Sequence, residues 1–391
     1  MKNARSWFIS AGEHSGDLLA RDLVKAVSEN DPDIRFFGVG GDEMQSVGVD
    51  IKVHLARLSV MGLFEVLSKL PEIVEIEQEI LDTIERQNPE VCILVDFPGF
   101  HFRLAKRLKA RGIKVVQYVA PKVWAWGQER VKRLQSDFDL VLGVLPFEKQ
   151  FFTSHGVNFE YVGSPHIERV MAAGESVNGL TLDSNKKCVA ILPGSRKSEI
   201  KRVAPELLAI FDEIHSIEKN NLEYLLPVSP NLDHKFVMRE FHVGDSLIPK
   251  EFIKPFKYRN LIFVPGSSLE VMNIASAAIL TSGTATLECG LLKTPMIVLY
   301  KMNNLSYHIA KFKLKVNWIS LVNLSANKTI VNEYIQHIPY AKVANEIISL
   351  AEESETRMKQ LLALEDMAKE YHGEAEKNAA TWIFNLVKGQ K

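Results

Sequence analysis

The sequence VCILVDFPGFHFRLAKRLKARGIKVVQYV, residues 91–119, decides the fold class. It contains an apolar run at Val91–Asp96, an amphipathic segment at Phe102–Ala110 and a second apolar run at Lys114–Val119. Short, nearly continuous apolar runs separated by a helical pattern are typical of parallel strands that helices cover on both faces. The stretch therefore predicts one strand–helix–strand unit of a doubly wound α/β sheet.

The same alternation extends outward from this stretch in both directions. In the first half of the chain, further strands are predicted at Trp7–Ser10, Ile34–Val39, Leu140–Val144 and Glu160–Val162. The pattern restarts after residue 187, with predicted strands at Cys188–Leu192, Glu223–Pro227, Ile262–Val264, Ala278–Thr281 and Met296–Leu299. The chain is thus expected to form two tandem Rossmann-like doubly wound parallel-sheet domains with a helical C-terminus.

The expected domain boundaries follow from composition. We predict an N-terminal domain at residues 1–170, a small polar linker at 171–187 and a second domain at 188–340. Residues 341–391 are predicted to be helices, which either pack back on the N-terminal domain or exchange with a partner chain in a homodimer. A chain of 391 residues is long enough for two such cores.

Composition excludes several classes of protein. The formal net charge of −1 argues against a strongly basic nucleic-acid-binding protein, so no nucleic-acid partner is expected. Three scattered cysteines in apolar runs suggest buried free thiols in a reducing compartment. The N-terminus lacks the apolar run of a signal peptide, and no stretch approaches the ~18 apolar residues of a spanning helix. A cytoplasmic protein that can still contact a membrane surface is expected.

In the first domain, two loops that follow strands carry candidate site residues. In the loop Gly12–Asp17, the glycines and the free N–H groups of a helix start favour an anion or a polar substrate group, with Ser15, Gly16 and Asp17 as contacts. Asp96 ends an apolar strand and is a candidate general base, with Glu13 the next candidate. The structural alternatives are helix N-caps or an Asx turn.

In the second domain, two similar loops suggest a nucleotide-sugar site. The turn at Ser195 and Arg196 suits a diphosphate, although an exposed surface loop is the alternative. At the stretch TSGTATLE, Ser282, Gly283 and Thr284 place hydroxyl and N–H groups at a helix start. Glu288 follows about one turn later, where a carboxylate can bind both ribose hydroxyls; a capping box is the alternative. Ligands of such folds bind at the carboxyl ends of the strands, so a UDP-sugar donor site is predicted there.

No metal and no cofactor are expected. The two Asp-x-Asp matches, at 31–33 and 137–139, precede strands, whereas a metal that binds a diphosphate needs such a pair on a loop after a strand. Histidines and cysteines nowhere show the spacing of a zinc site.

One apolar segment and one basic helix raise the question of lipid contact. The stretch Leu58–Leu70 is either core or a face that contacts membrane or acyl chains, through Val60, Met61, Leu63, Phe64 and Leu67. The basic helix is either a solvated face or a contact for anionic lipid, through Arg103, Lys106, Arg107, Lys109 and Arg111.

In their order and spacing, the motifs of the whole chain resemble the lipid-A-disaccharide synthase family (glycosyltransferase family 19). The stretches that carry the resemblance are GEHSGD (Gly12–Asp17), LSVMGLFEVL (Leu58–Leu67), VDFPGF (Val95–Phe100), YVAPKVWAWGQERVKRL (Tyr118–Leu134), LPFEKQFF (Leu145–Phe152), YVGSP (Tyr161–Pro165), LPGSRKSEI (Leu192–Ile200), SGTATLECGLLKTPMIV (Ser282–Val298) and SLVNLSANKTIVNEYIQ (Ser320–Gln336). The resemblance implies the two-Rossmann (GT-B) fold and a hexosyltransferase of lipid A and lipopolysaccharide biosynthesis. It further implies a metal-independent, inverting enzyme on the cytoplasmic face of the inner membrane.

The reaction implied by the resemblance is transfer of 2,3-diacylglucosamine from UDP-2,3-diacylglucosamine to 2,3-diacylglucosamine 1-phosphate. Matched residue by residue, Asp96 is the family's proposed base, and the UDP-binding residues are Arg196, Glu288 and Asn323. The sequence departs from the family pattern at His14, where a small residue is usual, and at Val322, where proline is usual. A UDP-N-acetylglucosamine 2-epimerase, a murein-type glycosyltransferase and a non-catalytic nucleotide-sugar-binding module are the alternatives.

Overall fold

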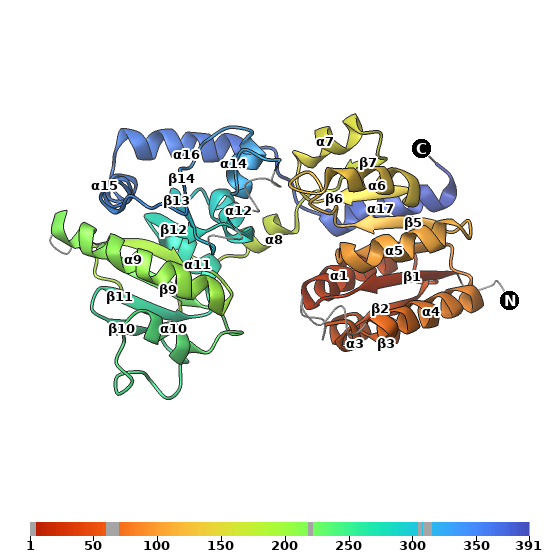
Figure 1. Ribbon diagram of the computed structural model, residues 1–391, viewed down its shortest axis with the longest axis horizontal. Coiled ribbons are helices and arrows are strands. Elements are labelled where there is room, and N and C mark those ends of the chain that lie inside the picture. Colours follow the sequence, from red (N-terminus) through yellow and green to blue (C-terminus); the bar gives the residue numbers. More distant parts are fainter. Residues whose placement is uncertain (1–4, 60–69, 218–221, 304–306, 308–314, 391) are drawn as a thin grey trace. The chain divides into compact units, whose positions relative to one another are not determined.

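The computed structural model describes residues 5–59, 70–217, 222–303, 307 and 315–390, and Figure 1 shows their arrangement within each of two compact units. The first unit extends to Pro165 and also includes the C-terminal segment from His372 onward. The second unit is His166–Tyr371. Each unit is built on one sheet of seven strands. The predicted α/β class with two parallel-sheet domains is confirmed.

The first unit contains a parallel sheet with the strand order β3-β2-β1-β4-β5-β6-β7. Strand β4 (Val91–Val95) is completely buried, which explains its uninterrupted apolar sequence. The strand order reverses between β1 and β4, and ligands bind beside such a reversal in doubly wound sheets. The other strands are β1 (Ser6–Ala11), β2 (Arg35–Gly40), β3 (Asp50–His54), β5 (Lys114–Tyr118), β6 (Leu140–Gly143) and β7 (Phe159–Tyr161).

Helices connect these strands. In α1 (His14–Asn30) the buried residues Ala20, Leu23, Val24 and Val27 recur at helical spacing, so one stripe of the helix faces the sheet. Helix α5 (Pro98–Lys109) begins with a proline at a position where its missing N–H costs nothing. The others are α2 (Asp42–Ser46), α3 (Ala56–Ser59), α4 (Leu70–Gln87), α6 (Val131–Asp137) after a 3₁₀ turn at Gln128–Arg130, α7 (Glu148–Ser154) and α17 (Ala375–Lys388).

The second unit contains a sheet with the order β10-β11-β9-β8-β12-β13-β14, parallel except where β10 pairs with β11. Its strands are β8 (Lys187–Leu192), β9 (Leu222–Val228), β10 (Phe256–Tyr258), β11 (Leu261–Pro265), β12 (Ala277–Thr281), β13 (Met296–Tyr300) and β14 (Glu333–Ile335). Its helices are α8 (Pro165–Met171), α9 (Lys197–Ile217), α10 (His234–Glu240), α11 (Ser268–Ile274), α12 (Thr284–Leu291), α14 (Leu321–Ala326), α15 (Tyr340–Ala351) and α16 (Glu355–Ala368).

Three of these strands, β3, β10 and β14, were not predicted from the sequence. All three lie at the edge of a sheet and have three to five residues, and none of them is buried throughout. A strand that is covered on one side only, and is this short, produces no apolar run by which it can be recognised.

The C-terminal helix α17 belongs to the first unit, where it contacts α1 and β5. The ring of Phe384 lies 5.2 Å from that of Trp7 in β1. The Lys114 ammonium donates to the carbonyls of Leu386 and Val387, at 2.8 and 3.0 Å. Both carbonyls lie in the last turn of the helix, where basic side chains commonly bind the carbonyls, and that of Leu386 also accepts from the N–H of Gly389 at 3.1 Å. The last helix therefore completes the core of the first unit although it is separated from it by the whole second unit in sequence.

Replacement of Ile383 by alanine tests this packing. The Ile383 side chain is fully buried, so its truncation should lower the free energy of unfolding by about 2–4 kcal/mol. Denaturant-induced unfolding of the full chain measures the change. Thr381→Ala, on the exposed side of the same helix, should stay within about 0.5 kcal/mol of the wild type. Equal effects of the two substitutions would contradict the packing described here.

Candidate functional site

In the first unit, two predicted loops lie next to each other at the carboxyl edge of the sheet. Strands β1 and β4 are paired, with Ala11 opposite Val95, so the residues that follow them emerge side by side. A Cβ atom at Gly12 would lie only 2.2 Å from the Phe97 ring, so a larger residue does not fit there. The structure thus brings the loop of Glu13 together with the turn of Asp96.

Asp96 has the properties expected of a general base. Burial raises the pKa of its carboxyl group above the usual range, although the Phe97 backbone N–H and the charge of Lys122 act in the opposite direction. A carboxylate with a raised pKa is a stronger base than an ordinary aspartate. The side chain is only half-buried, so a substrate hydroxyl can reach it.

The remaining residues of the first loop divide into exposed and buried ones. Glu13 and Ser15 are exposed, whereas Gly16 and Asp17 are buried. The Asp17 carboxylate accepts hydrogen bonds from the backbone N–H groups of Gly41 and Glu43, at 2.7 and 3.1 Å. It therefore stabilises the start of α2, and its two oxygens are engaged within the fold.

In the second unit, the two predicted donor loops are also neighbours. Strands β8 and β12 are paired, with Leu192 opposite Leu280, so the turn at 193–196 and the start of α12 lie next to each other. The N–H groups of Ser195 and Arg196 both donate to the Glu199 carboxylate, at 3.0 and 3.2 Å. The Glu199 carboxylate thus already accepts hydrogen bonds from the N–H groups of this turn. A phosphate group would bind the same N–H groups in the same way.

The Arg196 side chain is available for a ligand. It is 79% exposed, and its guanidinium lies 3.2 Å from a Glu199 oxygen. An exposed pair of this kind is weak. The guanidinium can therefore exchange Glu199 for a diphosphate at little cost.

The start of α12 leaves room for a ligand near the backbone. Apart from the neighbouring backbone, no atom of the described residues lies within 4 Å of the position that a Cβ at Gly283 would take. The Ser282 hydroxyl donates to the carbonyl of Ile319, at 2.7 Å, which fixes the turn that leads to Thr284. Backbone N–H groups at such an open helix start are suited to phosphate oxygens.

Glu288 lies inside this unit with two basic partners that the sequence analysis missed. One of its carboxylate oxygens is 2.7 Å from the guanidinium of Arg169 and 3.1 Å from Nδ1 of His166. Both partners belong to α8 and are three residues apart, so they share one face of this helix. That spacing, directly after the YVGSP motif, was the signal in the sequence. A ligand that binds Glu288 has to share it with these two side chains or displace them.

Comparison with known proteins assigns this arrangement to a family. A family model described as lipid-A-disaccharide synthetase matches residues 7–387. The chain belongs to the lipid-A-disaccharide synthase family. It is accordingly a glycosyltransferase of lipid A biosynthesis.

Relatives with this name match along most of their length. The chain is 38% identical over 353 residues to the lipid-A-disaccharide synthase of Nitrosococcus oceani, covering 89% of this chain and 88% of the relative. It is 36% identical over 339 residues to that of Myxococcus xanthus, covering 86% and 85%.

Solved structures of more distant proteins share the fold. The glycosyltransferase of kitacinnamycin superimposes with a TM-score of 0.63 at 14% identity, covering 98% of this chain and 99% of its own. A UDP-GlcNAc 2-epimerase from Neisseria meningitidis, bound to UDP-GlcNAc, gives 0.56 at 12% identity, with 98% and 99% covered. At these identities the likeness concerns the fold alone, and it confirms the predicted GT-B architecture of this synthase family member.

Asn323 is fully engaged within the protein. Its amide nitrogen donates to the Val331 carbonyl and to Glu333, each at 2.9 Å. Its oxygen accepts from the N–H groups of Ile330 and Val331, at 2.8 and 3.0 Å. An asparagine side chain has no further hydrogen-bonding capacity. In this structure Asn323 therefore holds the segment before β14 in place, and its predicted contact with the donor stays a prediction.

The predicted lipid-contact residues Val60, Met61, Leu63, Phe64 and Leu67 lie outside the described residues. Of the basic helix α5, Arg103 and Arg107 bind the buried carboxylate of Glu77 in α4, at 2.7 and 3.1 Å. In the described ranges no helix combines the length and apolar character that a membrane span requires. Those ranges also contain no cluster of three or more histidine, cysteine or acidic side chains that could hold a metal ion.

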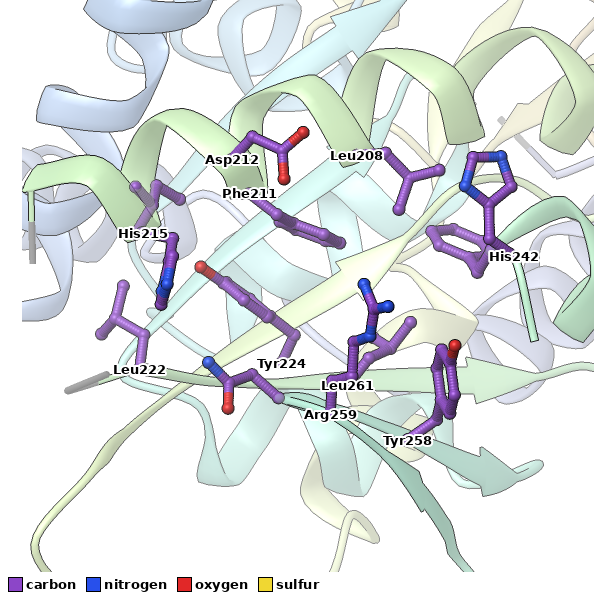
Figure 2. A pocket seen from close by; sticks show the side chains of 13 residues that line it. Leu208, Phe211, Asp212, His215, Leu222, Tyr224, His242, Tyr258, Arg259 and Leu261 are labelled. Atoms are coloured by element: carbon purple, nitrogen blue, oxygen red, sulfur yellow. The ribbon is translucent and has the colours of Figure 1, made fainter. Parts of the chain in front are cut away.

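A cavity of about 350 Å³ lies elsewhere in the second unit, between α9 and the amino ends of β9 and β11. Figure 2 shows Phe211 of α9 above Tyr224 of β9, and their rings stack with centroids 4.1 Å apart. The loops of Ser195 and Ser282 follow the carboxyl ends of their strands, at the opposite edge of the same sheet. The cavity is therefore separate from the predicted donor site.

Replacement of Asn323 by alanine tests its role in the fold. The change leaves the buried backbone groups of Val331 and the half-buried N–H of Ile330 without these partners, which should lower the free energy of unfolding by about 2–4 kcal/mol. Thermal and denaturant unfolding measure this loss. Asn345→Ala, at an exposed position of α15, should change stability by no more than about 0.5 kcal/mol. A stable Asn323→Ala variant that only binds UDP more weakly would contradict the structural role.

Proposed function

We propose that the protein transfers 2,3-diacylglucosamine from UDP-2,3-diacylglucosamine to 2,3-diacylglucosamine 1-phosphate. The products are the β-1,6-linked lipid A disaccharide 1-phosphate and UDP. The observation that carries the proposal is the family match over residues 7–387, which includes every loop described above. The raised pKa of Asp96 also supports the proposal, because the reaction requires a general base.

Asp96 is proposed to act as the general base. The 6-hydroxyl of the acceptor is a weak nucleophile, and it has to lose a proton as it attacks the anomeric carbon of the donor sugar. Direct attack with departure of UDP inverts the configuration at this carbon and requires a single base. The raised pKa of Asp96 suits this role, and Glu13, exposed at the start of α1, is the second candidate.

UDP is proposed to leave with the help of the second unit and without a metal. Negative charge grows on the diphosphate as the glycosidic bond breaks. The Arg196 guanidinium and the N–H groups near Ser282, Gly283 and Thr284 would offset this charge. Glu288 would bind the ribose hydroxyls, with His166 and Arg169 setting its orientation.

The lipid nature of both substrates leads to the proposed location. Diacylated sugars need only partly leave a bilayer if the enzyme lies at its surface. We place the protein on the cytoplasmic face of the inner membrane, in peripheral contact with anionic lipid. Val60, Met61, Leu63, Phe64 and Leu67 are the proposed acyl or membrane contacts, and a homodimer stays a prediction.

A choice of donors separates this function from the alternatives. The purified protein is incubated with UDP-2,3-diacylglucosamine and the 1-phosphate acceptor, or with UDP-N-acetylglucosamine alone. Disaccharide and UDP should form only in the first mixture. Epimerisation or UDP release in the second mixture, without disaccharide in the first, would contradict the proposed function.

Replacement of Asp96 by asparagine tests the base. The variant should lose about 10²–10⁴-fold in turnover, while UDP affinity stays unchanged. In the wild type, turnover should fall as the pH is lowered through the pKa of Asp96, because the protonated group cannot accept a proton. Since burial raises this pKa, the loss should begin at a higher pH than for an ordinary aspartate. Asp33→Asn, at an exposed turn, is the matched control and should keep wild-type turnover. Near-normal turnover of Asp96→Asn would show that another residue is the base.

Replacement of Arg196 by alanine tests the diphosphate contact. Loss of a charge-assisted contact should weaken UDP binding by about tenfold or more, as measured by calorimetry. Arg239→Ala removes an exposed arginine of the same unit, which pairs with Asp245, and should leave UDP affinity unchanged. If the two variants bound UDP equally well, the proposed role of Arg196 would be wrong.

A further inference from the structure

The turn that carries Asp96 has an unusual backbone. Asp96 and Phe97 both adopt left-handed conformations, with φ angles of +50° and +47°. L-residues other than glycine avoid this region because Cβ approaches the backbone oxygen. Two such residues in succession persist only if the surroundings hold them in place.

Three hydrogen bonds hold the peptide groups of Asp96. Its carbonyl accepts from Nδ1 of His101 at 2.7 Å and from the amide of Gln117 at 3.3 Å. Its N–H donates to the carbonyl of Tyr118 at 2.7 Å. The two side-chain donors come from different elements, α5 and β5, so they fix the peptide group from two sides.

The His101 side chain has a defined protonation state. It is fully buried, and burial lowers its pKa to about 4, so it is neutral at physiological pH. A carbonyl can only accept, so Nδ1 must carry the proton that it shares with Asp96. Nε2 then has a free lone pair, which accepts from the hydroxyl of Ser10 at 2.9 Å. The carbonyl of Asp96 thus selects the tautomer, whereas the fully buried Ser10 of β1, whose hydroxyl can donate or accept, holds the other side of the ring.

We propose that His101 is a positioning residue for the glycosyl transfer: its Nδ1–H holds the left-handed turn at Asp96 and so directs the Asp96 carboxyl group. Ser10 fixes the orientation of the His101 ring through Nε2, and Gln117 is the second donor to the Asp96 carbonyl. This inference rests on the proposed function of Asp96 as the base.

The expected effect follows from geometry. Without the Nδ1–H donor, the Asp96 carbonyl keeps the longer hydrogen bond from Gln117, at 3.3 Å, which holds the peptide less firmly against rotation toward the ordinary right-handed or extended region. The Asp96 carboxyl group then no longer points toward the acceptor hydroxyl. A displacement of about 1 Å of a reacting group costs on the order of 10²-fold in rate. Donor binding involves the second unit and should not change.

Two substitutions at position 101 separate positioning from folding. His101→Phe keeps a planar ring but has no donor, and should lower kcat about 10²-fold with KM for the donor unchanged. His101→Asn places an amide nitrogen where Nδ1 lies, and should stay within about tenfold of the wild type. His155→Phe, at the exposed end of α7, is the matched control and should retain wild-type kcat.

The readouts are kcat, KM, UDP affinity and the unfolding midpoint of each variant. A folded His101→Phe variant with wild-type kcat would overturn the proposal, as would His101→Asn losing as much activity as His101→Phe. If His101→Phe does not fold, Ser10→Ala decides: it keeps His101 but removes the hydroxyl, and should lower kcat about fivefold at unchanged KM. Unchanged kcat in Ser10→Ala would then overturn the proposal.

Asp96→Asn, measured in parallel, separates this inference from the function on which it rests. If Asp96→Asn keeps wild-type turnover, the base assignment and the positioning role both fail. If Asp96→Asn loses turnover and folded His101→Phe does not, only the positioning role fails.

Discussion

All strand pairs of the first sheet, and all but one of the second, are parallel. A parallel strand can be followed by its neighbour only after a crossover helix, so every strand-to-helix loop of a unit emerges at the same edge. Residues far apart in sequence, such as Glu13 and Asp96, or Arg196 and Ser282, are thereby gathered without any direct bond between them. The chemistry proposed for this family member depends on that constraint within each unit.

Around these loops, several polar residues that belong to the motifs or directly follow one have structural roles. Asp17 stabilises the start of α2, Asn323 holds the segment before β14, and His101 fixes the backbone of Asp96. The side chains of all three are buried, where losing a hydrogen-bond partner is costly. Asp96 and Arg196 keep half-buried or exposed polar groups, and we propose direct contact with substrate for both. Glu288, the proposed ribose contact, is buried and paired with His166 and Arg169.

The sequence was sufficient to predict the fold because buried parallel strands such as β4 leave long apolar runs. It also placed Asp96 and Ser282 at strand ends, where the structure has them. It did not predict the partners of Glu288, because an ion pair with α8 depends on packing between distant segments. The sequence also did not show whether Asn323 contacts the donor or holds the segment before β14 in place. Both roles require an asparagine at this position. The left-handed turn at Asp96 could not be predicted either, because neither Asp96 nor Phe97 is glycine, the residue type that usually marks such a turn.

The central claim is that this chain performs an inverting, metal-independent glycosyl transfer between two diacylated sugars. The most direct measurement is the anomeric configuration of the product, determined by NMR coupling constants, after reaction of the full chain in the presence of a chelator. We expect a β-1,6-linked disaccharide, formed in equal amount with UDP and at the same rate with and without the chelator. An α-linked product, or a disaccharide that forms only when metal is restored, would contradict the account.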